Sequence, residues 1–262
     1  MTGFEELMLA SAAVIAALML GTWLLSLALD DVSIVDIAWC LGFVLVAWTC
    51  FAIADGSSTR KALVVSLTTI WGLRLGLYTF WQRRGTEEDF RYRAMRSRQG
   101  KRFRVSSLWL VFGLQGLGMW AVSLPVQAAQ VSETPTGLTV LDLVGVAIWC
   151  VGMFFEVGGD LQLRRFLSDP RNRGKVMRSG LWRYTRHPNY FGDFCVWVGL
   201  FVVALATGTG DAWWSVIGPL TMLLIFLRFF GVPLMEPHLA RREGYEDYVR
   251  HTSAFFPWPP KR

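Results

Sequence analysis

The chain is poor in the residues that bind metals or form disulfides. It has three histidines, fewer than membrane di-iron desaturases and hydroxylases require. Its cysteines lie within apolar runs, at spacings that suit neither a zinc site nor a disulfide framework. They are Cys40, Cys50, Cys150 and Cys195, and we interpret them as small core residues. The sequence therefore predicts no metal centre.

Charge is also scarce. Only 18 % of the 262 residues are charged, whereas 53 % are hydrophobic, and there are 13 Trp and 18 Phe. About 20 apolar residues cross the hydrocarbon core of a bilayer. Seven runs of this kind occur, at 7–29, 37–54, 62–82, 105–132, 138–155, 194–210 and 212–227. We therefore predict an all-α, polytopic membrane protein in which seven transmembrane helices form a single domain.

The first run is expected to remain in the protein as a membrane span. A cleaved secretory leader has a basic segment before its apolar core and a small-residue cleavage site after it. In this chain two acids, Glu5 and Glu6, precede the run, and no such site follows it cleanly.

Basic residues are concentrated in three segments. Of 26 Lys and Arg, 9 lie in residues 83–104, 8 in 164–186 and 6 in 228–262. If seven spans alternate, these segments share one side, which the positive-inside rule places in the cytoplasm. The N-terminus is then outside and the C-terminus cytoplasmic, in a bacterial inner membrane or, in a eukaryote, the endoplasmic reticulum. The net charge of +6 thus indicates contact with membrane lipid and not with nucleic acid.

Five acids fall within or beside the apolar runs, where a charge is costly and commonly functional. They are Asp36, Asp142, Glu156, Asp160 and Asp193. Asp142 lies near the outer end of its run, and we expect it to be a solvated helix terminus. Glu156, Asp160 and Arg164 recur every four residues and therefore share one helical face. That face is either an internal salt bridge or a polar stripe that lines a cavity.

Residues 179–193 form the most informative segment. Pro188 suits the first turn of a helix, so Asn189 and Asp193 lie one turn apart on the same face. Backbone amides at such a helix start favour a bound anion, as do the basic residues beside it. Those basic residues are Arg183, Arg186 and His187. A plain juxtamembrane anchor would have similar content, but it would not need two polar residues on one buried face.

A Rossmann nucleotide site is not indicated. The nearest glycine cluster, at 113–118, lies inside an apolar run with no strand before it, so the dinucleotide fingerprint lacks its context. Any nucleotide would need a site built between helices.

The stretch from Glu156 to Asp193 resembles the C-terminal half of the steroid 5α-reductase family, most closely its bacterial branch. The resemblance rests on Asp160-Leu-Gln-Leu-Arg164 and on Gly180-Leu-Trp-Arg-Tyr-Thr-Arg-His-Pro-Asn-Tyr-Phe-Gly-Asp193. It extends more weakly through residues 74–96 and 236–248. Isoprenylcysteine methyltransferases, phospholipid N-methyltransferases and sterol Δ14 reductases have similar Arg-His-Pro-Asn-Tyr segments. The added Asp160 stripe favours the reductase.

The resemblance implies a seven-helix enzyme that reduces the C4–C5 double bond of a 3-oxo-Δ4 steroid with NADPH. In this sequence the matching cofactor positions are Asp160, Arg164, Lys175, Tyr184, Asn189, Asp193 and Arg228. Looser matches are Arg171, His187, His238 and Tyr245. We expect residues 1–132 to supply mainly the pocket for a lipophilic, steroid-like substrate and residues 133–262 mainly the cofactor site, in a monomer.

The catalytic positions match the family less closely. The family's glutamate near the start of the second helix corresponds to Asp36, and its tyrosine in the third helix corresponds to Trp71, which has no hydroxyl. Tyr78 lies seven residues further along the same face and is the substitute candidate. Hydride addition to an enone needs a donor at the carbonyl oxygen. A carboxylic acid kept neutral by an apolar site could donate, and Asp36 is either that acid or a helix-start residue near the surface.

Two other functions remain open from the sequence. One is an S-adenosylmethionine-dependent membrane methyltransferase of the isoprenylcysteine or phospholipid type. The other is a non-enzymatic lipid-binding or scaffold protein built on a sterol reductase fold.

Overall fold

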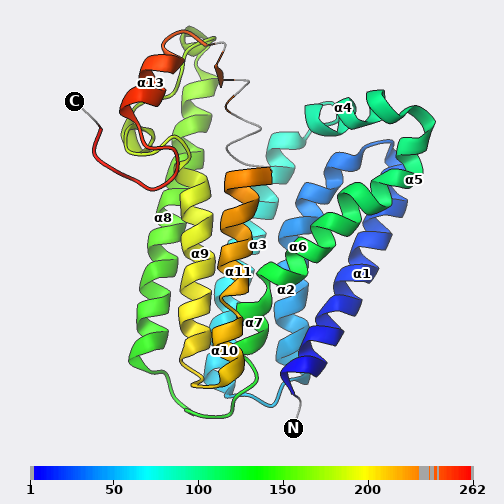
Figure 1. Cartoon of the computed structure of the whole chain (residues 1–262), viewed down its shortest axis with the longest axis vertical. Coiled ribbons are helices and arrows are strands. Elements are labelled where there is room, and N and C mark those ends of the chain that lie inside the picture. The colour runs from blue at the N-terminus through cyan, green and yellow to red at the C-terminus, as the bar shows by residue number, and fades with distance from the viewer. Residues whose placement is uncertain (1–2, 230–235, 237–238, 241, 261–262) are drawn as a thin grey trace. The chain divides into compact units, whose positions relative to one another are not determined.

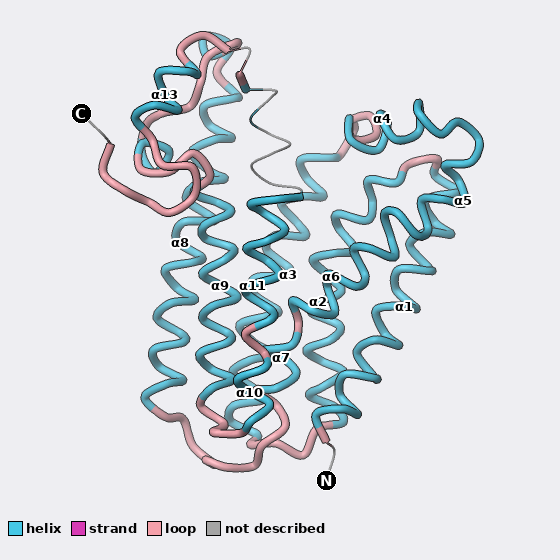
Figure 2. The backbone as a smooth tube through the Cα atoms, in the orientation of Figure 1, coloured by secondary structure: helices cyan, strands magenta, loops and turns pink. Residues whose placement is uncertain are grey.

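The computed structural model describes residues 3–229, 236, 239–240 and 242–260. Within these residues the regular structure is helical, and the β pairing is limited to two isolated bridges (Figures 1 and 2). Seven helices are long and apolar enough to cross a membrane, at Phe4–Leu29, Val32–Ile53, Ser58–Arg83, Phe90–Val122, Val140–Ser168, Pro188–Leu205 and Gly210–Phe229. The predicted all-α, multi-pass membrane fold is therefore confirmed.

The chain divides into two compact units. Unit 1 comprises residues 1–139 and 204–218, and unit 2 comprises residues 140–203 and 219–262. The boundary falls close to the one expected between the substrate and cofactor segments. That division of roles stays a prediction, and the two units are described separately below.

The first three spans of unit 1 pack side by side. They are α1 (Phe4–Leu29), α2 (Val35–Ile53), which follows a 3₁₀ turn, η1 (Val32–Ile34), and α3 (Ser58–Arg83). A Cβ atom on Gly72 of α3 would lie 2.9 Å from the Cys40 carbonyl oxygen of α2. Glycine is therefore needed where these two backbones approach closely.

The fourth span is longer and more broken than the apolar run at 105–132 predicts. It comprises α4 (Phe90–Gln99), η2 (Gly100–Arg102), α5 (Phe103–Ser107), a π-helix η3 (Leu108–Gly113) and α6 (Leu114–Val122), and the short helix α7 (Leu124–Ala128) follows it. Arginine-rich α4 is helical although it is not apolar, because Asp89 caps it by accepting from the Arg91 amide. Pro125 lies in the first turn of α7, where its missing N–H breaks the helix.

At the opposite end of unit 1, side chains at the start of α3 form hydrogen bonds to the loop that follows α7. Ser57 Oγ donates to the Thr136 carbonyl at 2.8 Å, and Arg60 donates to the carbonyls of Pro135 (3.3 Å) and Gly137 (3.4 Å). Arg60 is fully buried. Its guanidinium therefore holds the loop that follows α7 and is not an exposed surface charge.

Unit 2 is built on two helices in direct backbone contact, α8 (Val140–Ser168) and α9 (Pro188–Leu205). A Cβ atom on Gly152 would lie 2.6 Å from the Gly192 carbonyl oxygen, and one on Gly199 would lie 2.6 Å from that of Gly145. Any larger residue there would push the helices apart. The unit continues through α11 (Ile217–Leu224), which follows α10 (Gly210–Trp214), and the π-helix η6 (Ile225–Phe229).

The α8 helix extends 13 residues beyond the apolar run predicted at 138–155, since the polar stripe continues the same helix. The prediction for Asp142 at its other end is wrong. Its side chain is fully buried and is not a solvated terminus, although Val140, Leu141 and Leu143 around it in the first turn of α8 are exposed.

Residues 242–260, the returning segment, pack on the loop between α8 and α9. The loop contains η4 (Pro170–Asn172) and η5 (Gly180–Arg183), and the returning segment contains α13 (Tyr245–His251). Tyr248 Oη donates to the Trp182 carbonyl at 2.5 Å, and Trp182 Nε1 donates to the Gly159 carbonyl of α8 at 3.1 Å. The loop is thus fixed between a membrane helix and the returning segment (Figure 1).

Candidate functional site

In unit 1, polar side chains meet at the start of α2. The Asp36 carboxylate forms ion pairs with Arg83 at the end of α3 (2.9 Å) and Arg91 in α4 (2.8 Å). Its other oxygen, Oδ1, accepts a hydrogen bond from Tyr92 Oη at 2.9 Å. Asp36 is therefore an acceptor held by three donors. The sequence left open whether it is a neutral acid in an apolar site or a helix-start residue near the surface.

Asp89 completes a ring of alternating charges. It pairs with Arg83 at 2.7 Å and with Arg91 at 2.8 Å, the same two arginines that bind Asp36. Burial raises the pKa of the Asp89 carboxyl, but the Arg91 hydrogen bonds and the charges of Arg91 and Arg83 outweigh it and lower that pKa. The ring fixes the α3–α4 turn, and with it Tyr92, beside Asp36.

Tyr92 is the hydroxyl group that sequence reasoning missed. Its side chain is only 3 % exposed, and its oxygen accepts from Gln115 Nε2 at 3.1 Å while it donates to Asp36. In the sequence it is one aromatic residue in an arginine-rich segment. Only the fold of the α3–α4 turn brings it to a residue 56 positions away.

Trp71, which corresponds to the family's catalytic tyrosine, and Tyr78, the substitute candidate, both lie on α3. Trp71 is fully buried and packs edge-on against Phe43, with ring centroids 5.5 Å apart, as a core residue does. Tyr78 lies under the Arg74 guanidinium, 5.3 Å from it. A catalytic role for Tyr78 stays a prediction.

In unit 2, the close approach of α8 and α9 brings predicted cofactor residues together. Asn189 Nδ2 donates to Asp160 Oδ1 at 3.1 Å across the two helices. Glu156, Asp160 and Asp193 are 2 %, 5 % and 8 % exposed. Arg164, the last member of the predicted stripe, is exposed beyond them. The acidic residues of the stripe are therefore buried, and the basic residue at its end is exposed.

A second polar cluster lies where α9 begins. Arg186 Nη2 lies 2.8 Å from Glu236 Oε1, and His187 Nε2 lies 3.7 Å from the same oxygen. The neighbouring His187 and Arg186 lower the pKa of Glu236 although burial opposes them. Burial, followed by the Glu236 charge, raises the pKa of Tyr245 to about 12.

This cluster contains several polar atoms without hydrogen-bond partners in the described residues. They are Arg186 Nε, His187 Nε2 and Tyr245 Oη, and all are buried. A buried polar atom left unsatisfied costs about 1–3 kcal/mol, so such groups usually meet a ligand or water. The atoms include both donors and acceptors, as a nucleotide carrying amide and phosphate groups would require.

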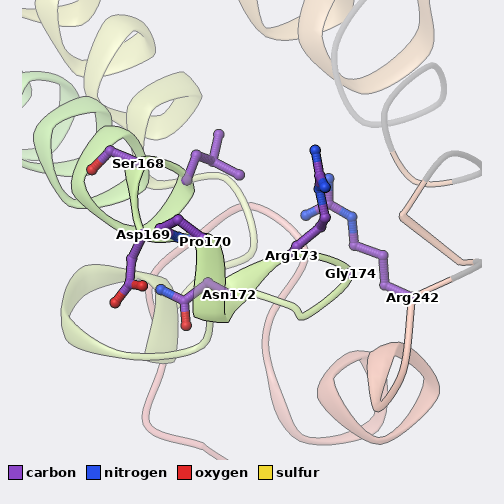
Figure 3. A pocket seen from close by; sticks show the side chains of 8 residues that line it. Ser168, Asp169, Pro170, Asn172, Arg173, Gly174 and Arg242 are labelled. Carbon is purple, nitrogen blue, oxygen red and sulfur yellow. The ribbon is translucent and has the colours of Figure 1, made fainter.

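A cavity of about 500 Å³ opens at the end of α8. It is lined by Leu167, Ser168, Asp169, Pro170, Asn172, Arg173, Gly174 and Arg242. The side chains of Arg173 and Arg242 approach from two separate segments of the chain, opposite Asp169 and Asn172 (Figure 3). Two guanidinium groups in one concave site favour a phosphate.

Two basic residues predicted to bind the cofactor, Arg171 and Lys175, lie outside this lining. Arg171 is 87 % exposed and pairs with Asp169 at 2.8 Å. Lys175 is exposed and forms a backbone bridge to Glu243, and its carbonyl accepts from Arg242 at 3.1 Å. Arg173 and Arg242, which the sequence analysis did not single out, take their place because the returning segment crosses the loop there.

Two of the remaining predicted residues, Tyr184 and Arg228, are exposed on unit 2, and His238 lies outside the described residues. Arg186 is not free to bind an anion as its motif suggested. It donates to the Val249 carbonyl at 3.2 Å and the Thr252 carbonyl at 3.4 Å. Across the described residues, His, Cys, Asp and Glu form no group that could hold a metal ion.

Comparison with known proteins places the chain in a family. Residues 22–252 match the family described as "Protein of unknown function (DUF1295)". The 3-oxo-5-alpha-steroid 4-dehydrogenase 1 of Bos taurus is 28 % identical over 44 % of this chain and 41 % of its own length. The human protein of the same name is 31 % identical over the same shares, 44 % and 41 %. A probable O-methyltransferase, ustE of Ustilaginoidea virens, is 30 % identical over 38 % of this chain and 34 % of its own length.

The chain thus spans about two fifths of the length of the curated relatives it matches. No solved structure matches it. Because the family match covers most of the chain, this protein belongs to the DUF1295 family and is related to the steroid 5α-reductases.

Proposed function

We propose that the protein reduces the C4–C5 double bond of a 3-oxo-Δ4 steroid, or of a similar lipophilic enone, with NADPH. The observation that carries the proposal is the buried Tyr92 hydroxyl, hydrogen-bonded to Asp36 within a ring of ion pairs. The curated relatives named as 3-oxo-5-alpha-steroid 4-dehydrogenases support this class of substrate.

Tyr92 supplies what an enone needs. When hydride adds to the β-carbon, the electron pair of the double bond moves to the carbonyl oxygen, and a donor aimed at that oxygen lowers the barrier. Tyr92 Oη becomes such a donor when its single hydrogen, which Asp36 Oδ1 accepts in this structure, turns to the substrate oxygen, while Gln115 Nε2 still donates to it. A proton then reaches the α-carbon, so enone, hydride and one proton give the saturated ketone. Asp36 accepts the Tyr92 hydroxyl hydrogen until the substrate oxygen takes its place.

The polar residues of unit 2 fit a dinucleotide. The unsatisfied atoms of His187 and Tyr245 and the Asp160–Asn189 pair suit its amide and ribose groups. Arg173 and Arg242 suit its phosphates. When bound there, NADPH supplies the hydride. The residues of the chain bind and orient the cofactor through these contacts.

The reaction is tested on the full chain, purified in mild detergent, with a 4-en-3-one steroid and either NADPH or NADH. We expect NADPH oxidation together with a product two hydrogens heavier. Tyr92→Phe should lower kcat by about 10²-fold or more, as loss of one donor to a developing oxyanion does. Tyr78→Phe removes the hydroxyl that the sequence alone favoured, and it should keep most of the activity if Tyr92 is the donor. An active Tyr92→Phe protein would remove Tyr92 from the mechanism.

The phosphate cavity is tested by comparing the two cofactors. Arg173→Ala and Arg242→Ala should each raise the Kd of NADPH more than that of NADH, since an arginine–phosphate pair is lost. Arg171→Ala and Lys175→Ala are the comparison variants, because the sequence alone favoured them. If these two discriminate between the cofactors and the cavity arginines do not, the 2′-phosphate lies outside the cavity.

The second candidate is a membrane methyltransferase, which the match to a probable O-methyltransferase favours. Mass spectrometry of the nucleotide that copurifies with the protein separates the two functions. NADPH or NADP⁺ would support reduction, and S-adenosylmethionine or its demethylated product would support methyl transfer.

A further inference from the structure

The segment after α13 carries exposed aromatic side chains although it lies outside the seven spans. The Phe256 side chain is 52 % exposed and that of Trp258 is 69 % exposed, whereas Phe255 between them and α13 is 3 % exposed. Such a patch on a water-facing loop would be unfavourable, and patches of this kind mark contact surfaces.

The patch lies against a membrane-spanning helix. The ring of Phe256 lies 6.1 Å from that of Phe191 and 6.2 Å from that of Phe194. Both belong to the first two turns of α9, the span that begins at Pro188. The segment therefore reaches the level at which α9 enters the membrane, and Figure 1 shows it descending beside the ends of α8 and α9.

The ring contacts continue onto the lipid-facing surface. Phe191 contacts Phe155 with centroids 5.0 Å apart, and Phe155 contacts Phe154 at 5.6 Å. Phe154 is 63 % exposed in the middle of the α8 span, where exposure means contact with lipid. One aromatic surface thus runs from the span to Phe256.

The segment is held in this position by hydrogen bonds to the loop before α9. Trp258 N donates to the Tyr184 carbonyl at 2.9 Å, and Thr185 Oγ1 donates to the Phe255 carbonyl at 2.8 Å. The backbone that carries the exposed rings is therefore fixed beside the start of α9.

We propose that residues 255–258 form an interfacial anchor, in which Phe256 and Trp258 insert at the boundary between the headgroups and the acyl chains. Tryptophan prefers this boundary because its ring is apolar and its N–H needs a polar partner. Arg183, in the loop between α8 and α9, and Arg250, in α13, are both exposed, and their charges suit anionic headgroups. The partner is the lipid bilayer, and the proposal does not depend on the reaction proposed above.

The test uses the full chain in nanodiscs of phosphatidylcholine and phosphatidylglycerol, labelled with 5-fluorotryptophan. Trp258→Phe identifies the ¹⁹F resonance of Trp258 among those of the 13 tryptophans. A lipid carrying a nitroxide on its acyl chain should broaden this resonance, and a water-soluble gadolinium chelate should leave it sharp. Trp109, 68 % exposed within the fourth span, is the positive control and is identified by Trp109→Phe.

Broadening of the Trp258 resonance by the chelate but not by the nitroxide lipid would overturn the proposal. If Trp258→Phe fails to fold, Trp258→Tyr gives the same assignment with the polar tip retained. In both variants an unchanged pattern of the other resonances shows that the rest of the protein keeps its fold.

Discussion

At the scale of single residues, a side chain's role in this protein depends on what lies across from it. Asp36 meets two arginines and a tyrosine, and so serves as a fixed acceptor. Arg186 belongs to a motif typical of anion sites, yet carbonyls of the returning segment take up its guanidinium.

Asp193 is the residue whose loss we expect to separate folding from reaction. It is 8 % exposed and lies one turn beyond Asn189, so the two can serve one ligand. Asp193→Leu should abolish enone reduction while the protein still inserts and folds. Losing a hydrogen bond to a charged group costs roughly 1.5–3 kcal/mol, or about ten- to a hundredfold in affinity. Steady-state kinetics with NADPH titrations measure the effect.

Asp193→Asn, which keeps the shape and one acceptor, is the matched variant and should retain part of the cofactor affinity. Wild-type turnover by the Asp193→Leu protein would make the residue structural and would strengthen the methyltransferase alternative.

At the scale of elements, helix pairs and turns decide which polar residues meet. Glycines at the α8–α9 contact let the Asp160 stripe reach Asn189, and the ring of ion pairs at the α3–α4 turn holds Tyr92 against Asp36.

Replacing Gly152 tests the α8–α9 contact. A Cβ there would lie 2.6 Å from both the Gly192 carbonyl oxygen and the Val196 nitrogen, which belong to backbone and cannot rotate away. Gly152→Ala should therefore lower the Tm in detergent, at a cost of about 1–3 kcal/mol for overpacking. Gly21→Ala, where nothing lies within 4 Å of the new Cβ, is the control and should leave Tm unchanged or raised. Equal Tm values for the two variants would contradict the contact.

The Asp89 turn should respond to acid. A carboxyl whose pKa is lowered by folding stabilises the folded state above its unfolded pKa, here 3.8, and loses this contribution as the pH falls through the lowered value. The Tm of the wild-type protein should therefore fall below pH 3.8 more steeply than that of Asp89→Asn, which lacks the charge. Parallel Tm profiles from pH 7 to pH 3 would show that the ring adds no stability.

At the scale of the whole molecule, seven spans and the distribution of basic residues predict the topology. The three basic segments lie between or after alternate spans, so the positive-inside rule places all of them in the cytoplasm.

Labelling with a membrane-impermeant maleimide tests this orientation. Ser58, exposed at the start of α3, should be external, and Ser97, exposed in α4, should be cytoplasmic. Ser58→Cys should therefore react in intact cells or sealed vesicles, and Ser97→Cys should react only after permeabilisation. The parent chain with its four cysteines gives the background. The opposite pattern would reverse the topology and move the proposed sites to the outer side.

The sequence by itself determined the membrane class, the seven spans and the shared helical face of Glu156, Asp160 and Arg164. Each of these follows from local patterns: uncharged length gives the spans, and four-residue spacing gives the shared face of Glu156, Asp160 and Arg164. Because only the apolar part of a helix is visible as a run, the pattern ended α8 too early and missed the helix in Phe90–Gln99.

Only the tertiary structure decided which distant groups meet. It brought Tyr92 to Asp36, placed Arg242 opposite Arg173, and buried Asp142 and Arg60. The physical reason is that these contacts depend on turns, on a broken fourth span and on a segment that folds back, none of which has a periodic signal. In a membrane protein the apolar faces toward lipid and toward the core look alike in sequence, so burial is decided by packing alone.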